Sequence, residues 1–193
     1  YMEKKTNKAS SWSPFGSKQI EDMSSHAIAH LPRPTDVRTF WNSKVCNTRC
    51  SFRNYVSNFV LRMSLSHPSL KINNDVVGFI RGEGRRKVHP NYIAGMLTTK
   101  IIVLAQRDNW EAHFRLDEAL LSGALVLHDP QTYWPHMMID GVNFVLYHNM
   151  SDLRFKILYY LDPLNEEKRI GIGQRGRELA LNHHRVWDQA ERV

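Results

Sequence analysis

Short apolar runs alternate along this chain with longer segments whose apolar residues recur at helical spacing. Lys100–Ala105 and Ala124–Leu127 are the clearest apolar runs, and such runs are typical of strands buried on both faces of a sheet. Between them, apolar residues from Phe114 to Leu120 follow the period of a helix, and Gly123 stands where a left-handed residue would end it. This segment therefore predicts a βαβ unit.

The same pattern predicts further elements on both sides of this unit. Further strands are expected at Asp36–Trp41, Asp75–Ile80 and Asn143–Tyr147. A helix is expected at Arg49–Leu65, and Pro90 could sit in the first turn of a short helix that ends near Leu97. Two more helices are expected, from an N-cap at Ser151 to Leu161 and from an N-cap at Asn165 to about His184. Strands that alternate with helices form a parallel sheet. We therefore expect an α/β fold, with a Rossmann-like parallel sheet of about five strands flanked by helices.

Residues 1–34 differ from the rest of the chain. They are rich in Ser, Lys and Pro and show little periodicity, which favours a poorly ordered arm or the remnant of a linker. The remaining residues, 35–193, suit a single domain in length. The chain begins with Tyr1 rather than methionine, so we interpret it as a fragment or a processed piece.

Composition and charge narrow the choice of partner. With 42% hydrophobic and 23% charged residues, the chain resembles an ordinary soluble domain. No run approaches the roughly 18 apolar residues of a membrane span. The net charge of +7 indicates an anionic partner. The basic residues are dispersed and do not alternate with aromatic ones as in single-strand binders, so a small phosphate-bearing molecule fits better than nucleic acid.

Two motifs are predicted to carry no site. Cys46 and Cys50 have no recognisable partners for a metal ion, so no metal site is expected. The sequence from Gly171 to Gly176 matches G-x-G-x-x-G, but no strand precedes it. Since the dinucleotide fingerprint needs a strand before its first glycine, we do not expect it to bind a dinucleotide.

The ligand site of a βαβ unit lies at the carboxyl ends of its strands, here residues 106–114. Backbone N–H groups near His113 and Phe114 would be free donors at the start of the helix, and such donors bind phosphate. Arg115 could add a bidentate contact to the same phosphate, or it could be a solvated side chain of the first turn. The sequence leaves both open.

Three further side chains are expected near the same edge. Trp110 could stack on a base or a sugar, or it could fill the core below the turn. Asp129 could line the cleft or only form an Asp-Pro turn. Arg81 follows the predicted strand Asp75–Ile80 and could neutralise phosphate or belong to a solvated basic loop.

The pattern W-E-x-H-x-R-L-x-E-A-L-x-S-G-A-L-V-L, from Trp110 to Leu127, resembles family 1 glycosyltransferases with two Rossmann-like domains. The resemblance is greatest to the CgeB/YkvP spore-protein-like group, and it covers the donor-binding, C-terminal half of such enzymes. It implies that Glu118 accepts hydrogen bonds from the ribose hydroxyls of the donor, which suits a carboxylate; a surface position is the alternative. It also implies that Glu111 faces the sugar. Six residues separate the two glutamates, one fewer than in many such enzymes, so the role of Glu111 stays open.

The resemblance implies a glycosyltransferase domain that binds a nucleotide-diphosphate sugar and transfers the glycosyl group to an unknown acceptor. Glu111 and Glu118 are the catalytic candidates. Helix amides and Arg115 would stabilise the leaving diphosphate, so no metal or other cofactor is expected, and a missing N-terminal domain would supply the acceptor site. The alternatives are a non-catalytic nucleotide or sugar-phosphate binding module and, ranked last, a nucleic-acid-binding domain.

Overall fold

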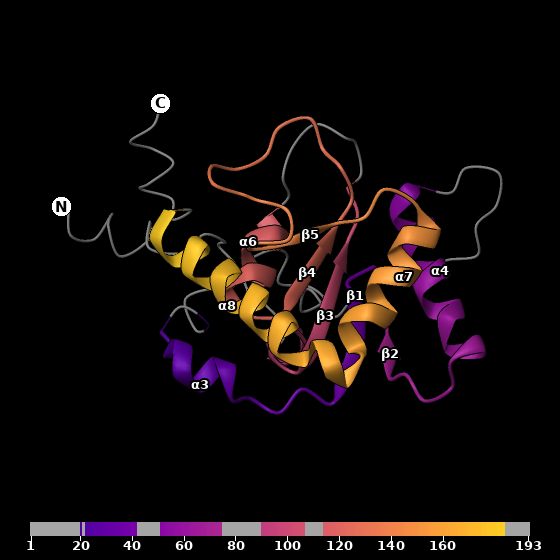
Figure 1. The fold of residues 1–193 in the computed structure, drawn as a ribbon, viewed down its shortest axis with the longest axis horizontal. Helices are drawn as coiled ribbons and strands as arrows, with labels where there is room; N and C mark the ends of the chain where they lie inside the picture. The colour runs from indigo at the N-terminus through magenta and orange to yellow at the C-terminus, as the bar shows by residue number, and fades with distance from the viewer. Residues whose placement is uncertain (1–19, 21, 42–50, 75–89, 107–113, 184–193) are drawn as a thin grey trace, which may run out of the picture.

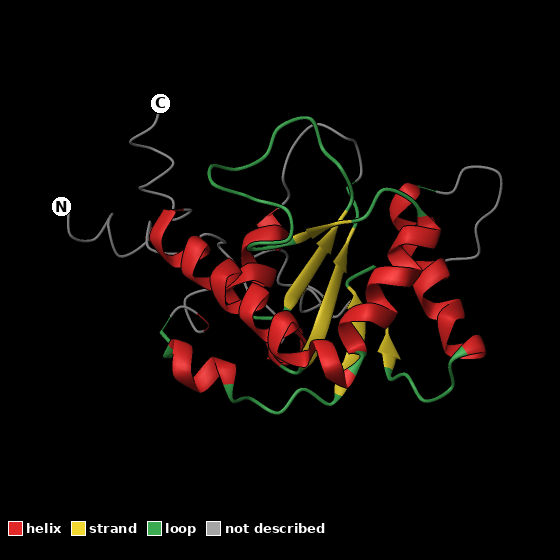
Figure 2. Cartoon of the chain, in the orientation of Figure 1, coloured by secondary structure: helices red, strands yellow, loops and turns green. Residues whose placement is uncertain are grey.

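A five-stranded sheet lies at the centre of the molecule, and all of its neighbouring strands pair in parallel (Figures 1 and 2). The computed structural model describes residue 20 and residues 22–41, 51–74, 90–106 and 114–183. The strands are β1 (Thr35–Thr39), β2 (Ile72–Asn73), β3 (Thr99–Leu104), β4 (Leu125–His128) and β5 (Val145–Leu146). Their order across the sheet is β2-β1-β3-β4-β5. The predicted α/β fold with a parallel sheet is therefore confirmed.

Helices cover both faces of this sheet (Figure 1). They are α3 (Ser25–Ala29), α4 (Phe52–Ser66), α5 (Pro90–Leu97), α6 (Phe114–Leu121), α7 (Met150–Leu161) and α8 (Glu166–His183), with a 3-10 turn at Pro163–Asn165 before α8. Buried side chains of α5 and α6 form one core cluster, and those of α4 and α7 form the other. None of these helices combines the length and the apolar character needed to cross a membrane, as far as the described residues extend.

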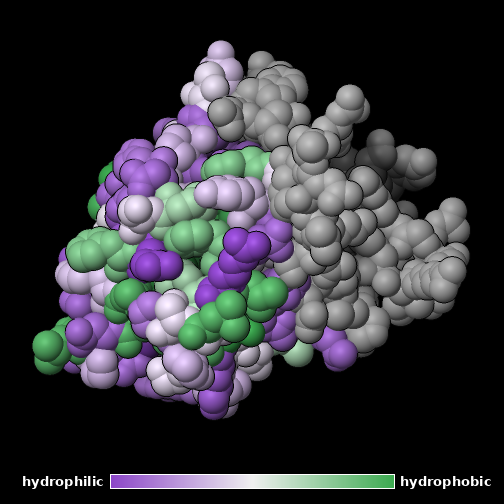
Figure 3. Space-filling view, turned by 90° about the vertical axis from the view of Figure 1, so that its right-hand side faces the viewer, coloured by the Kyte–Doolittle hydropathy of each residue, from purple (hydrophilic) through white to green (hydrophobic). Residues whose placement is uncertain are grey.

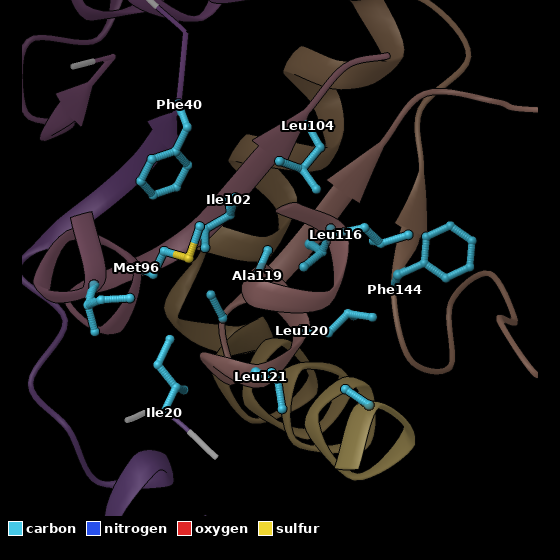
Figure 4. Close-up of a cluster of buried hydrophobic side chains, with 14 of the residues drawn as sticks. Ile20, Phe40, Met96, Ile102, Leu104, Leu116, Ala119, Leu120, Leu121 and Phe144 are labelled. Atoms are coloured by element: carbon cyan, nitrogen blue, oxygen red, sulfur yellow. The ribbon is translucent and has the colours of Figure 1, made fainter. Parts of the chain in front are cut away.

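Strand β3 shows why the predicted apolar run is continuous. Ile102 and Leu104 belong to the cluster under α5 and α6 (Figure 4), whereas Ile101 and Val103 belong to the cluster under α4 and α7. Successive side chains of a strand point to opposite faces, so a strand with helices on both faces needs apolar residues at every position. The predicted strand at residues 100–105 is confirmed within one residue at each end.

The predicted N-cap of α7 is wrong by two positions. The helix begins at Met150, and the side chain of Asn149, not Ser151, accepts a hydrogen bond from the Asp152 amide at 2.9 Å. Asn and Ser are comparably good N-cap residues, so the sequence alone did not distinguish them. Asp152 lies in the first turn of the helix.

The strand predicted at 75–80 lies outside the described residues. Strand β2 precedes it and was not predicted. It has only two residues, Ile72 and Asn73, which pair with Val37 and Arg38 of β1. Two residues are too few for an alternating pattern to emerge from the sequence, so only the pairing reveals this strand.

The last part of the segment predicted as an arm packs against the domain. Ile28 of α3 is buried, and the guanidinium group of Arg33 donates to the carbonyl oxygens of Thr99, at 2.7 Å, and Ser122, at 2.6 Å. Arg177 of α8 donates to Met23 O at 2.5 Å. The domain boundary at residue 34 stays a prediction, although residues 22–34 already contact the amino edge of the sheet.

The glycines of the G-x-G-x-x-G motif lie inside α8, and two of them allow close packing. A Cβ at Gly173 would overlap the carbonyl oxygen of Gly123, and one at Gly176 would lie 2.6 Å from Asn143 O. The helix therefore approaches the backbone at two places. Gly123 itself has a φ of +69°, as predicted for the residue that ends α6.

Seen from the side of α4 and α7, the surface mixes hydrophobic and hydrophilic side chains (Figure 3). Phe52, Tyr55 and Leu65 of α4 and Phe155 of α7 are exposed. Both helices nevertheless bury apolar residues against the sheet, including Val56, Val60, Leu153 and Ile157, as expected of amphipathic helices.

Candidate functional site at the carboxyl edge of the sheet

The order of the strands places a crevice next to β1. The chain adds β2 on one side of β1 and then β3 on the other, so the connections leave the carboxyl ends of β1 and β3 in opposite directions. Ligands of open α/β sheets bind outside the carboxyl ends of the strands at such a point. Here the strand ends continue into Phe40 and Trp41 after β1 and into Ala105 and Gln106 after β3.

Two arginines meet over Trp41 at this point. Arg53 lies in the first turn of α4, and its Nε donates to Ala105 O at 2.9 Å. Arg115 lies in the first turn of α6 and is only 9% exposed. Their guanidinium carbons are 4.8 Å and 4.7 Å from the centroid of the Trp41 ring, which is within cation–π range. Arg115 is therefore not the solvated side chain that the sequence left open.

Hydrogen bonds hold Trp41 to the helix that carries Arg53. The hydroxyl of Ser57, on α4, donates to Trp41 O at 2.5 Å and lies 2.8 Å from the hydroxyl of Thr39 at the end of β1. The side chain of Ser51 caps α4 by accepting from the Asn54 amide at 3.4 Å. These contacts fix the start of α4 beside the end of β1.

Glu118 lies inside the protein, on the same helix as Arg115. Its exposed fraction is 0%, and its Oε2 accepts a hydrogen bond from the hydroxyl of Tyr92 on α5. Burial and the charge of Glu118 raise the pKa of Tyr92, and Arg115 lowers it. The tyrosine therefore stays a neutral donor at ordinary pH. The predicted contact of Glu118 with ribose stays a prediction, and in this conformation the carboxylate does not reach solvent.

Asp129 lies at the predicted edge, but its carboxylate is used within the fold. It is 2% exposed and accepts from the Gln106 amide, with oxygen distances of 3.0 Å and 3.3 Å. The Gln106 side chain in turn donates to Gln131 at 3.1 Å. These bonds tie the segments after β3 and β4 together. Burial and the charge of Asp129 raise the pKa of the nearby Tyr147, whose hydroxyl donates to Leu104 O at 2.8 Å.

Four of the other predicted site residues, Trp110, Glu111, His113 and Arg81, lie outside the described residues. The fifth, Phe114, is the first residue of α6. Their predicted roles stay predictions.

Arg53 and Trp41 are candidate residues that sequence reasoning missed. The available signal was a basic residue in the first turn of the helix that follows the first strand, together with the aromatic residue that ends that strand. Only the order of the strands in the sheet brings Trp41 and Arg53 next to Arg115 of α6.

A cavity of about 290 Å³ lies beside this cluster. Its lining includes Arg38, Phe40, Asn91, Tyr92 and Gly95. The Phe40 and Tyr92 rings pack edge to face at 5.2 Å. Among the described residues, no group of three His, Cys, Asp or Glu side chains could hold a metal ion.

Comparison with known proteins identifies a family. The family model described as "Glycosyl transferase-like" matches residues 69–193, more than half of the chain. No curated protein matches the sequence at a significant level.

Several solved structures share the fold at low sequence identity. TarM aligns with a TM-score of 0.58 and 14% identity, over 84% of this chain and 35% of TarM. HepE of Anabaena, solved with UDP and glucose, aligns with a TM-score of 0.58 and 12% identity, over 91% of this chain and 51% of HepE. The C-terminal domain of LpcC, a group 1 glycosyl transferase family protein from Francisella tularensis, aligns with a TM-score of 0.54 and 14% identity, over 84% of this chain and 92% of that domain. This chain thus spans about a third of TarM and about half of HepE.

Proposed function

Because the chain belongs to the glycosyl transferase-like family, we propose that this domain binds the nucleotide-diphosphate part of a sugar donor at the carboxyl edge of its sheet. The observation that carries the proposal is the meeting of Arg53 and Arg115 over Trp41. Both cations come from first turns of helices, where the peptide dipoles also favour an anion. A diphosphate at the crevice between β1 and β3 would lie within reach of both.

The same arrangement suits the chemistry of glycosyl transfer. Negative charge develops on the leaving diphosphate as the bond to the sugar breaks, and donors fixed beforehand stabilise that charge without reorganising. Arg53 is held by the Ala105 carbonyl, and Arg115 is buried beside Tyr92 and Trp41. In this proposal the two guanidinium groups and helix amides supply the positive charge, so transfer requires no metal ion.

Glu118, which is buried, is proposed to bind the ribose of the donor. For its carboxylate to accept from ribose hydroxyls, the side chains that cover it must shift on donor binding. The hydrogen bond from Tyr92 would then keep one carboxylate oxygen in place while the other is presented to the ribose. Roles for Glu111, Trp110, His113, Phe114, Arg81 and Asp129 in donor binding, and the closer relation to the CgeB/YkvP group, rest on the sequence alone.

The acceptor site is proposed to lie on another domain. The match to the C-terminal domain of LpcC covers 92% of that domain, whereas TarM and HepE are longer than this chain. We therefore expect the 193-residue chain to bind a donor weakly and to turn it over slowly. Rapid glycosyl transfer by the isolated chain would contradict the two-domain proposal.

Thermal unfolding with a panel of nucleotides tests donor binding. The panel contains UDP, GDP, ADP and TDP, their glucose conjugates, and the four matching nucleosides. A diphosphate present at about 100 times its Kd should stabilise the fold by about 2.7 kcal/mol, and the matching nucleoside should stabilise it much less. Equal stabilisation by nucleoside and diphosphate would contradict the role of the arginines, and no stabilisation by any compound would contradict donor binding.

A non-catalytic binding module remains the second candidate, because Glu118 is buried. Release of the nucleotide diphosphate from the preferred sugar conjugate separates the two. An enzyme should hydrolyse the conjugate slowly and release the nucleotide diphosphate. An Arg115→Gln variant should release the diphosphate more slowly still. A module should bind the conjugate and release nothing above the rate in buffer.

A further inference from the structure

A second cavity lies at the opposite edge of the sheet from the proposed donor site. It has a volume of about 330 Å³ and lies between α3, α8 and the amino ends of β3 and β4. Figure 1 shows α3 and the first turns of α8 at this end of the strands. The volume is within the range of small-molecule sites, and nothing in the proposed glycosyl transfer uses this cavity.

Basic groups outnumber acidic ones in the lining. Four Lys or Arg side chains line the cavity against two Glu side chains, namely Arg33, Lys100, Arg169, Arg177, Glu166 and Glu178. Lys100 already pairs with Asp36 at 2.7 Å, and Arg177 donates to backbone carbonyl groups. Arg177 is the most buried of the three arginines, at 1% exposed, whereas Arg33 is only partly buried. Arg33 and Arg169 therefore offer a ligand more surface than Arg177.

Arg169 is buried with part of its hydrogen-bonding capacity unused. It is 5% exposed, and its Nη2 donates to Glu166 at 2.5 Å. Its Nε is buried and has no acceptor among the described residues. A buried donor without an acceptor carries a desolvation penalty, which is larger for a charged group, so an acceptor supplied by a ligand would be favourable.

Arg33 places a second positive charge nearby without a carboxylate in its hydrogen bonds. Its donors bind the carbonyl oxygens of Thr99 and Ser122, which are neutral groups. Burial and the positive charge of Arg169 lower the pKa of Arg33 to about 10. The two guanidinium groups therefore repel each other, and an anion between them would relieve the repulsion.

We propose that this cavity is a second ligand site, which binds a small phosphorylated molecule with its phosphate against Arg33 and Arg169. Guanidinium groups match phosphate oxygens in geometry and charge. Ile28, Leu31 and Ile170 also line the cavity and offer an apolar surface to the rest of the molecule. A bound ligand would tie α3 to α8 and so stabilise the packing of residues 22–34 on the domain.

A titration followed by NMR of backbone amides tests the site. Inorganic phosphate, glucose 6-phosphate and glucose are added separately to the 193-residue protein at constant ionic strength. We expect saturable shifts at Ile28, Gly123 and Ile170 with both phosphates and none with glucose. Saturation at lower concentration with glucose 6-phosphate identifies a phosphorylated molecule as the ligand. Shifts confined to Gln106 and the carboxyl edge, or equal shifts with glucose, would overturn the proposal.

Gln174 provides a variant that should not disturb the fold, because it lines the cavity from an exposed position on α8. Gln174→Glu should weaken binding of glucose 6-phosphate about three- to tenfold by charge repulsion, and Gln174→Lys should strengthen it. Asn182→Glu adds the same charge to an exposed position of the same helix outside the lining and should have little effect.

Arg169→Gln should abolish the titration while binding of nucleotides at the other edge is unchanged. If that variant does not fold, comparison of the Gln174 and Asn182 variants still tests whether the cavity binds the phosphate. Equal weakening by Gln174→Glu and Asn182→Glu would show a general effect of charge and overturn the proposal.

Discussion

The hydroxyl of Tyr92 donates a hydrogen bond to the carboxylate of Glu118, which joins α5 to α6 on one side of the sheet. Both residues are buried, and Arg115 lies on the same helix as Glu118, with its guanidinium carbon 6.0 Å from the Tyr92 ring centroid. The position of Arg115 in the candidate site therefore depends on a contact made inside the core.

Tyr92→Phe removes the donor and leaves a buried carboxylate with one hydrogen bond fewer. The free energy of unfolding should fall by about 1–3 kcal/mol, measured by urea denaturation at neutral pH. Tyr133→Phe is the matched control, because Tyr133 is 71% exposed, and it should change stability by no more than about 0.5 kcal/mol. Equal stability of the Tyr92 variant and the parent would show that the bond contributes nothing.

Arg53→Gln and Arg115→Gln should each weaken binding of the preferred nucleotide diphosphate. Loss of a charged hydrogen bond costs about 1.5–3 kcal/mol, which corresponds to a rise in Kd of about 10- to 100-fold. Titration calorimetry would measure the rise in Kd, on variants that keep the thermal stability of the parent. Arg62→Gln removes an exposed arginine from α4 at a distance from its first turn and should leave Kd unchanged; a similar rise for this control would argue against a specific contact.

The three glycines of α8 should respond differently to alanine. At Gly173 and Gly176 a Cβ would overlap backbone atoms, so Gly173→Ala and Gly176→Ala should each destabilise by about 1–3 kcal/mol or more. At Gly171 the nearest atom is the flexible end of Arg175, at 3.3 Å. Gly171→Ala should therefore be neutral or stabilising by up to about 1 kcal/mol, because alanine favours the helix.

Thermal denaturation of the three variants under one condition measures these effects. A loss at Gly171 equal to that at Gly173 would contradict close packing as the reason for the motif.

Stability should decline at alkaline pH because buried tyrosines, among them Tyr92 and Tyr147, resist ionisation. Burial and neighbouring carboxylates raise the pKa of Tyr92 and Tyr147 above the ordinary value. Above about pH 10 the unfolded chain loses protons that the folded state keeps, so the free energy of unfolding falls as pH rises. Each tyrosine contributes a slope of about 1.4 kcal/mol per pH unit.

Urea denaturation between about pH 9 and about pH 11 would measure this decline. Tyr92→Phe and Tyr147→Phe should each make it shallower by that slope, and the exposed control Tyr133→Phe should follow the parent. An unchanged decline in both buried variants would contradict the raised pKa values.

The strands and helices near the candidate site could be predicted because their patterns are local. Residues 101–105 alternate between two apolar clusters and so form one continuous apolar run. The short helix predicted with Pro90 in its first turn and its end near Leu97 is observed at Pro90–Leu97. The cap at Asn149 and the two-residue strand β2 were not, since in each case several backbone arrangements suit the residues equally well.

The sequence by itself determined the α/β class, the parallel sheet and the edge at which Arg115 and Asp129 lie, because helical and strand periodicities follow from each segment's own residues. Only the tertiary structure decided that Arg115 meets Arg53 over Trp41, that Tyr92 binds Glu118, and that α3 closes a basic cavity against α8. Each of these contacts joins residues distant in sequence. Their free energy depends on which elements become neighbours in the sheet and helix layers, and no local pattern records that order.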